Sequence, residues 1–187
     1  MTKVAVIVGS LSKNSVNRTF AQALGRFAAP KLQFEFIEIG DLPFYHVDHE
    51  GIPAPVQRFK DQIKSADAVL FVTPEYLRTI PAVLKNTIEW GQMPWGTTVW
   101  AGKPAAIAGV SIGAIGTAVA QSHLRSIASV LDLGLISQPE LYVTMRPGLI
   151  DENGEFTDDA FKSLLQTWVD RFSAWIERLE QKPKLQF

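Results

Sequence analysis

Cysteine is absent from the 187 residues of this chain, which excludes disulfide bonds, thiolate metal sites and a cysteine nucleophile. A strong charge of one sign is also absent, because 18 Lys and Arg residues nearly balance 19 Asp and Glu residues. The chain therefore lacks the basic surface typical of nucleic-acid-binding proteins. No apolar run approaches the length of a membrane span, and no N-terminal segment has the pattern of a secretion signal. These absences predict a cytoplasmic protein without a nucleic-acid or membrane partner.

Apolar runs alternate with helix-spaced amphipathic segments along the whole sequence. The runs predict strands at residues 4–8, 32–37, 68–72, 105–110 and 141–144, and the amphipathic segments predict helices at residues 17–27, 55–65, 82–90, 116–133 and 158–180. The first, third and fourth strands are almost continuously apolar, which is typical of a parallel sheet covered on both faces. No repeat, linker or change in composition divides the chain. We therefore predict one α/β domain over residues 1–187, built on a doubly wound sheet, with a mobile tail at about 181–187.

The loop after the first strand is rich in hydroxyl and amide side chains. It reads Gly9-Ser10-Leu11-Ser12-Lys13-Asn14-Ser15-Val16-Asn17 and leads directly into a predicted helix. Unpaired N–H groups at the start of a helix point outward, and the helix dipole favours a negative charge there. The serines and asparagines add neutral donors. The loop is therefore typical of a phosphate site with little formal charge, although a polar turn that caps the helix gives the same pattern.

Two further loops follow the third and fourth predicted strands, at residues 73–81 and 111–117. In doubly wound sheets the ligand binds at the carboxyl ends of the strands, so these loops and residues 9–17 are expected to meet at one crevice. Pro74 and Pro81 stiffen the second loop, and the glycines of the third allow the backbone to approach a flat ligand closely. Together the three loops suit a planar ring with a monophosphate tail.

Rival nucleotide and hydrolase motifs are incomplete in this sequence. The first loop lacks the second and third glycines of the G-x-G-x-x-G pattern, and no G-x-x-x-x-G-K-[ST] is present. Residues 109–113 match the G-x-S-x-G nucleophile elbow, but that mechanism needs an acid and then a histidine later in the chain. The only histidine after Ser111 in the sequence is His123, which lies in the next predicted helix. No acidic residue lies between Ser111 and His123. A serine hydrolase is therefore disfavoured.

A possible metal cluster lies between the second strand and the second helix. It consists of His46, Asp48, His49 and Glu50, in a loop that also contains proline and glycine. Two histidines three residues apart outside a helix present no fixed face to a metal. We predict a solvated loop here and no metal site.

The three loops and their flanking residues resemble the NADPH-dependent FMN reductase family of flavodoxin-like proteins, in particular its quinone and chromate reductase branch. The resemblance runs from the first strand to about Tyr142. The motifs that carry it are Gly9-Ser10-Leu11 with Ser15 and Asn17, Thr73-Pro74-Glu75-Tyr76 with Pro81, Leu84-Lys85-Asn86-Thr87-Ile88-Glu89-Trp90, Ala101-Gly102-Lys103-Pro104, the loop with Ser111, Gly113 and Gly116, and His123-Leu124-Arg125. Each motif is modest alone, but their order and spacing together are specific.

The resemblance implies a flavodoxin-like sheet of five parallel strands in the order 2-1-3-4-5, with helices on both faces and noncovalently bound FMN. It implies a flavoprotein oxidoreductase in which NADH or NADPH delivers a hydride to the flavin N5 by a ping-pong mechanism. The acceptors are then quinones, free flavins, azo dyes or metal oxyanions such as chromate. Because the flavin carries the chemistry, no catalytic side chain is expected. Homodimers or homotetramers are common in the family.

An alternative from another class is a flavodoxin-like electron carrier, or a regulatory FMN-binding protein, without pyridine-nucleotide turnover. The near-neutral net charge of −1 argues against a carrier, because carriers often dock through a surface of one sign.

The resemblance also assigns cofactor-binding residues by position. It implies that the FMN phosphate is held through side chains and backbone N–H groups of Ser10, Ser15, Val16 and Asn17. It places Pro74, Glu75 and Tyr76 along the flavin ring, where they contact it mostly through their backbone. Leu77 and Arg78 follow them in the same loop. It places on the other side of the ring Ser111 and Gly113.

Several residues of the chain depart from the family pattern. The usual arginine is replaced by Ser12, so either Lys13 or Arg18 compensates, or phosphate binding relies on neutral donors. The usual asparagine is replaced by Leu77, and Arg78 follows it. A guanidinium at the flavin mouth is expected to attract an anionic acceptor or the phosphates of the nicotinamide cofactor. A surface or interface salt bridge is the alternative for Arg78. No residue pattern chooses between NADH and NADPH.

Overall fold

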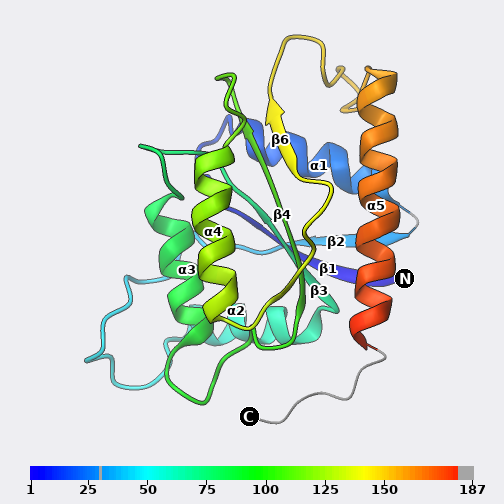
Figure 1. Cartoon of the computed structure of the whole chain (residues 1–187). Coiled ribbons are helices and arrows are strands. Elements are labelled where there is room, and N and C mark those ends of the chain that lie inside the picture. The colour runs from blue at the N-terminus through cyan, green and yellow to red at the C-terminus, as the bar shows by residue number, and fades with distance from the viewer. Residues whose placement is uncertain (30, 181–187) are drawn as a thin grey trace.

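A parallel sheet forms the middle of the molecule, and helices cover both of its faces (Figure 1). The computed structural model describes residues 1–29 and 31–180, so the tail predicted at 181–187 lies outside the described residues. The strands are β1 (Thr2–Val8), β2 (Leu32–Phe36), β3 (Ala68–Val72), β4 (Pro104–Ser111), β5 (Gly134–Leu135) and β6 (Leu141–Thr144). The helices are α1 (Val16–Ala28), α2 (Ala54–Ser65), α3 (Ala82–Gln92), α4 (Ala118–Val130) and α5 (Asp159–Glu180). This alternation confirms the predicted α/β class.

The strand order confirms the flavodoxin-like topology. The sheet runs β2-β1-β3-β4-β5, with β6 also paired to β4, and every pairing is parallel. The short strand β5 was not predicted: it pairs with the start of β4, whereas β6 pairs with the end of β4. Pro139 lies between them and has no N–H to donate to a ladder. The fifth position of the sheet is therefore divided between two short strands.

The helix predicted at residues 116–133 is shorter at both ends in the structure. It begins after Gly116 and Thr117, whose φ angles are +59° and +68°. It ends before Asp132, whose φ is +55°. These left-handed backbone conformations are incompatible with a right-handed helix. Sequence periodicity does not report them, which explains the error in the boundaries.

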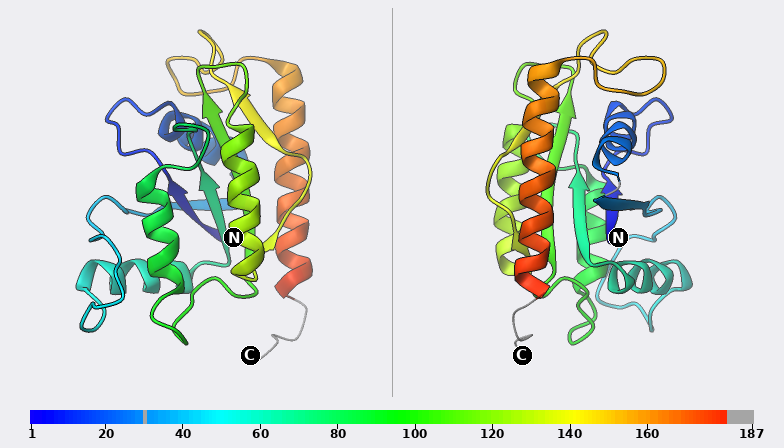
Figure 2. Two further views of the ribbon diagram at one scale, coloured as in Figure 1. Left: turned by 60° about the vertical axis from the view of Figure 1, so that its left-hand side comes forward. Right: turned by 90° about the vertical axis from the view of Figure 1, so that its right-hand side faces the viewer.

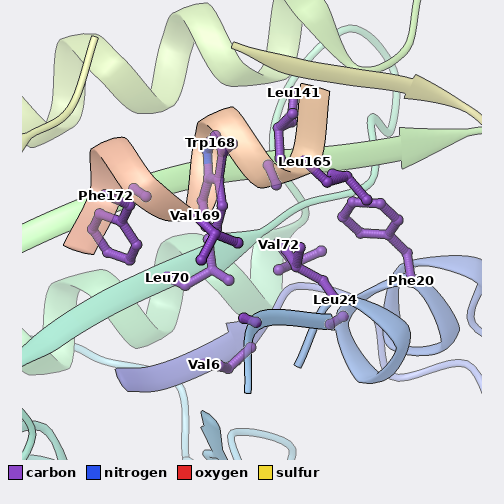
Figure 3. Packing of buried hydrophobic residues seen from close by; sticks show 14 of the residues in the cluster. Val6, Phe20, Leu24, Leu70, Val72, Leu141, Leu165, Trp168, Val169 and Phe172 are labelled. Carbon is purple, nitrogen blue, oxygen red and sulfur yellow. The ribbon is translucent and has the colours of Figure 1, made fainter. Parts of the chain in front are cut away.

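One hydrophobic core fixes α1 and α5 on the sheet. Phe20 and Leu24 of α1, together with Trp168 and Phe172 of α5, are fully buried. They pack against the strands as Figure 3 shows. Full burial of an aliphatic or phenyl side chain contributes about 1.5–3 kcal/mol. The packing therefore holds α1 in place, and with it the loop that leads into α1.

A second core lies beneath α2, α3 and α4 on the opposite face. Phe59 and Trp100 pack edge to face there with ring centroids 5.9 Å apart. The indole of Trp100 donates to the carbonyl of Ile88 at 3.0 Å. Gly91 has to be glycine, because a Cβ there would lie 2.2 Å from the Trp100 ring. This close approach fixes α3, which follows the second loop of the predicted crevice.

A buried lysine joins α2 to the end of α3. Lys60 is 1% exposed, and its Nζ donates to the carbonyls of Trp90 at 2.8 Å and Met93 at 2.9 Å. The positive charge lies at the carboxyl end of α3, where the helix dipole is negative. Burial nevertheless lowers the pKa of Lys60 to about 8, and the nearby charge of Lys64 lowers it further.

We expect the titration of Lys60 to make the free energy of unfolding depend on pH. The unfolded pKa is about 10.4, so between the folded and unfolded values the unfolded chain binds more protons. The contribution of this residue to the free energy of unfolding therefore increases as the pH rises from about 8 to about 10.4, by about 3 kcal/mol in total. Urea unfolding of wild type and Lys60→Met over this pH range measures the increase as a widening difference between the two proteins.

Lys13→Met is the matched control, because it removes an exposed lysine that does not act on the pKa of Lys60. Its stability should follow that of wild type across the same pH range. A difference between wild type and Lys60→Met that stays constant with pH would show that Lys60 titrates at an ordinary value.

Candidate functional site

Three loops meet at the end of the sheet where the parallel strands finish. Residues 9–15 follow β1, residues 73–81 follow β3 and residues 112–117 follow β4. In the left view of Figure 2 these loops lie at the upper end of the molecule. The Tyr76 hydroxyl of the second loop lies 3.5 Å from the Ser10 hydroxyl of the first. The first and second loops therefore meet at the carboxyl edge of the sheet, and the third follows the neighbouring strand β4 at the same edge.

The amino end of α1 forms an anion-binding recess. Ser15 caps the helix, and its hydroxyl oxygen accepts a hydrogen bond from the N–H of Arg18 at 3.2 Å. In the described part of the chain, the N–H groups of Val16 and Asn17 have no acceptor. Ser10 and Ser15 are buried beside them. Free N–H groups, buried hydroxyls and the positive end of the helix dipole together suit a phosphate group.

The side chain of Asn17 has a different task from the phosphate contact that the sequence resemblance implies. Its Nδ2 donates to the carbonyl of Val110 at 2.9 Å, and its Oδ1 accepts from the N–H of Val110 at 3.0 Å. Both residues are buried. The carboxamide therefore ties α1 to the end of β4, and the backbone N–H of Asn17 is the group left for a ligand.

Glu75 anchors the second loop to α4. Its Oε2 accepts from the N–H groups of Val119 and Ala120 at 3.0 and 3.1 Å. The residue before the helix, Thr117, makes no side-chain cap of its own. Glu75 therefore caps α4 from another loop, with its carboxylate turned into the protein and 6% exposed. The carboxylate is thus committed to α4 and Arg78, which leaves the backbone of Glu75 for a ligand.

Arg78 lies at the tip of a two-residue hairpin turn in the same loop. Tyr76 and Thr79 exchange backbone hydrogen bonds of 3.0 and 3.1 Å, and Leu77 and Arg78 between them have φ angles of +49° and +64°. Such a turn normally uses Asn and Gly, because both central residues are left-handed. Leu77 is 99% exposed. The Arg78 side chain is 70% exposed and lies 3.4 Å from the Glu75 carboxylate.

The third loop presents backbone rather than side chains. The hydroxyls of Ser111 and Thr144 both donate to the carbonyl of Gly113, at 2.7 and 3.2 Å. A Cβ on Gly113 would meet nothing nearer than 3.9 Å, whereas one on Gly116 would lie 2.8 Å from the Tyr142 carbonyl carbon. One side of the loop is therefore packed and the other open to a flat ligand. Thr144 was not predicted as a site residue. Its position at the carboxyl end of the last predicted strand is the feature of the sequence that could have indicated it.

The rival sites find no support in the geometry. His46 and His49 stack with ring centroids 3.9 Å apart, and the described residues contain no group of three side chains placed to hold a metal ion. His123 bonds to the hydroxyl of Thr79 at 2.9 Å, while the Ser111 hydroxyl donates to a carbonyl. Ser111 and His123 therefore do not form a serine–histidine pair.

Within the described residues, no helix combines the length and the apolar character needed to span a membrane.

The comparison with known families decides the assignment. The sequence pattern of the family described as NADPH-dependent FMN reductase matches residues 2–147, a stretch that contains all three loops. The chain belongs to this family. The resemblance described from the sequence is thereby confirmed, and the cofactors of the family are FMN and NAD(P)H.

Relatives of the chain match it over nearly its whole length. A 2-hydroxy-1,4-benzoquinone reductase of Burkholderia sp is 47% identical over 93% of this chain and 96% of its own. A quinone reductase of Pseudomonas putida is 43% identical over 93% of this chain and 94% of its own. The solved structure of FerB, a flavoenzyme NAD(P)H:(acceptor) oxidoreductase from Paracoccus denitrificans, superposes with a TM-score of 0.92 at 41% identity, covering 95% and 98% of the two chains.

The residues present fit FMN. The recess at α1 offers buried hydroxyls and free N–H groups to a phosphate. The open side of Gly113 allows a flat ring to approach the backbone, and the backbone of the second loop is anchored at Glu75 without using its crevice face. The donors are mostly neutral, as the composition of the first loop indicates.

The left-handed leucine gives a stability prediction. A non-glycine residue in this conformation costs about 1–2 kcal/mol, whereas Asn adopts it more readily. We expect Leu77→Asn to raise the free energy of unfolding by about 0.5–1 kcal/mol, because no buried contact is lost from a side chain that is 99% exposed. Urea unfolding of the flavin-free protein measures the change.

Leu77→Ala is the control, since alanine removes the exposed side chain but keeps the backbone strain. Its stability should stay close to that of wild type. Equal stability of Leu77→Asn and Leu77→Ala would contradict the presence of strain at this turn.

Proposed function

We propose that this protein is an FMN-dependent NAD(P)H oxidoreductase that reduces quinones. The observation that supports this most strongly is the anion-binding recess at the amino end of α1, placed beside two loops that present backbone to one crevice. The relatives named as a 2-hydroxy-1,4-benzoquinone reductase and a quinone reductase each cover 93% of the chain, which supports the same acceptor class.

The recess is proposed to hold the phosphate of FMN. The hydroxyls of Ser10 and Ser15 would donate to the phosphate oxygens, together with the backbone N–H groups of Val16 and Asn17. Charge-assisted hydrogen bonds from neutral donors to an ionised group are about twice as strong as neutral ones. The fixed amino end of α1 therefore binds the phosphate without reorganising.

The flavin ring is proposed to lie between the second and third loops. Pro74, Glu75 and Tyr76 would line one side through their backbone, with Ser111 and Gly113 on the other. When bound, FMN accepts a hydride from NAD(P)H and passes two electrons to the acceptor. The protein orients the ring and supplies hydrogen bonds to it. No side chain is assigned as a general acid or base.

The mouth of the crevice is proposed to select the acceptor. Tyr76, Leu77 and Ile112 are exposed apolar side chains in the second and third loops, which suit planar rings such as quinones, free flavins or azo dyes. Arg78 adds a positive charge that suits anionic acceptors, including metal oxyanions such as chromate. We also propose a homodimer or homotetramer located in the cytoplasm, with small-molecule acceptors and neither nucleic acid nor membrane as a partner.

The first test follows the flavin spectrum. Purified protein should contain FMN or take it up, and anaerobic NADH or NADPH should bleach the flavin absorbance because hydride reaches the ring. Addition of 1,4-benzoquinone should then restore the oxidised spectrum. Protein that binds no FMN would refute the proposal, and FMN that NAD(P)H leaves unbleached would favour an electron carrier or regulatory protein instead.

The second test concerns Arg78. Its ion pair with Glu75 is long, and the Arg78 side chain is 70% exposed to solvent, so the pair contributes at most about 1 kcal/mol to stability. We expect Arg78→Ala to raise the KM for an anionic acceptor or for NAD(P)H by about three- to tenfold, while the Tm changes little. Lys85→Ala, which removes an exposed cation from α3, is the control. Unchanged KM values for both substrates would leave Arg78 as a surface ion pair only.

A further inference from the structure

Arg18 places a positive charge in the first turn of α1. The helix begins at Val16, and its first turn contains no acidic residue. A cation at the amino end of a helix is electrostatically unfavourable, because the helix dipole already makes that end positive. The position of Arg18 is therefore unfavourable in the protein alone, and a bound negative charge would reverse this.

No carboxylate within the described residues neutralises Arg18. The ion pairs of this part of the chain do not include it. Two other arginines form hydrogen bonds that hold the fold together. Arg26 donates to the carbonyl of Gly154 at 2.7 Å, and Arg58 donates to the carboxylate of Asp41 at 2.6 Å. The side chain of Arg18 has no comparable partner within the described residues.

Helix geometry predicts that the Arg18 side chain reaches the recess. Side chains of a helix lean toward its amino end and cover the turn before them. Arg18 follows Ser15 by three residues, which places both on the same face of the helix. The guanidinium is therefore expected to extend over the recess formed by Ser10, Ser15 and the free N–H groups of Val16 and Asn17.

We propose that Arg18 supplies the positive charge that holds the 5′-phosphate of FMN, so that the protein binds FMN in preference to riboflavin. This inference rests on the proposed use of the recess for the FMN phosphate. The other donors of the recess are neutral, whereas a phosphate monoester carries nearly two negative charges at neutral pH. A guanidinium binds such a group through two parallel hydrogen bonds. Lys13, the other cation of the loop, is exposed and precedes the helix cap.

Flavin binding tests the proposal directly. Deflavinated protein is titrated with FMN and with riboflavin, and binding is followed by quenching of the flavin fluorescence. Arg18→Gln should weaken FMN binding by about tenfold at low salt, while riboflavin binding changes less than about twofold because riboflavin has no phosphate. Added NaCl should reduce the FMN difference by screening the charge. Ser12→Arg in the Arg18→Gln background returns a guanidinium to the loop and should recover FMN affinity.

Thermal stability separates a binding role from a structural one. Loss of an unpaired cation from the amino end of α1 should leave the Tm of flavin-free protein unchanged or raise it. The increase in Tm on adding FMN should become smaller, because that increase depends on affinity. Arg171→Gln removes an exposed arginine of α5 that forms no ion pair in the described part of the chain. It controls for the change in net charge and should match wild type.

The outcomes distinguish this inference from the proposed function. Wild type that binds no FMN would refute the function itself. Wild type that binds FMN, with Arg18→Gln binding it within about threefold, would overturn the role of Arg18 and leave the function standing. A lower Tm of flavin-free Arg18→Gln would assign Arg18 to the structure of α1 and would also overturn the proposal.

Discussion

The double hydrogen bond between the Asn17 carboxamide and the backbone of Val110 is the interaction on which the site depends most. It joins the amino end of α1 to the end of β4, across 93 residues of sequence. Both partners are buried, so each group left unpaired would cost about 1–3 kcal/mol. The bond sets the distance between the anion-binding recess and the third loop. The fold itself therefore holds the amino end of α1 at a fixed spacing from the end of β4.

The contacts of Glu75 remove the amino end of α4 from the places where an anion could bind. Both α1 and α4 begin at the carboxyl edge of the sheet, and either dipole could attract a negative charge. Thr117 is left-handed and provides no side-chain cap, so Glu75 supplies the carboxylate that α4 lacks. The amino end of α4 is thus already neutralised, whereas α1 keeps N–H groups and an Arg18 side chain that have no partner among residues 1–29 and 31–180. This difference supports the proposal that the phosphate of FMN binds at α1.

The sequence predicted what depends on periodicity and on resemblance. The doubly wound parallel sheet followed from the apolar runs, and the placement of the loops at one edge followed from general rules for such sheets. The strand order was implied by the family resemblance alone. Contacts between distant segments were not predictable in this way. The resemblance implies that Asn17 contacts the phosphate, whereas in the structure its carboxamide is hydrogen-bonded to Val110. Glu75 gives no sign in the sequence that it caps α4, and the left-handed Thr117 that creates the need for this cap leaves no periodic signal.

The anchors within the three loops divide the site into a fixed part and an exposed part. Groups expected to face FMN are held by hydrogen bonds from other elements: Ser111 and Thr144 hold Gly113, and the amino end of α4 holds Glu75. The turn of Leu77 and Arg78 projects beyond these anchors, with both side chains exposed. Substitutions at the turn therefore change the mouth of the crevice without disturbing the cofactor scaffold. The proposed cofactor scaffold and the proposed entrance for the acceptor can therefore change independently of each other.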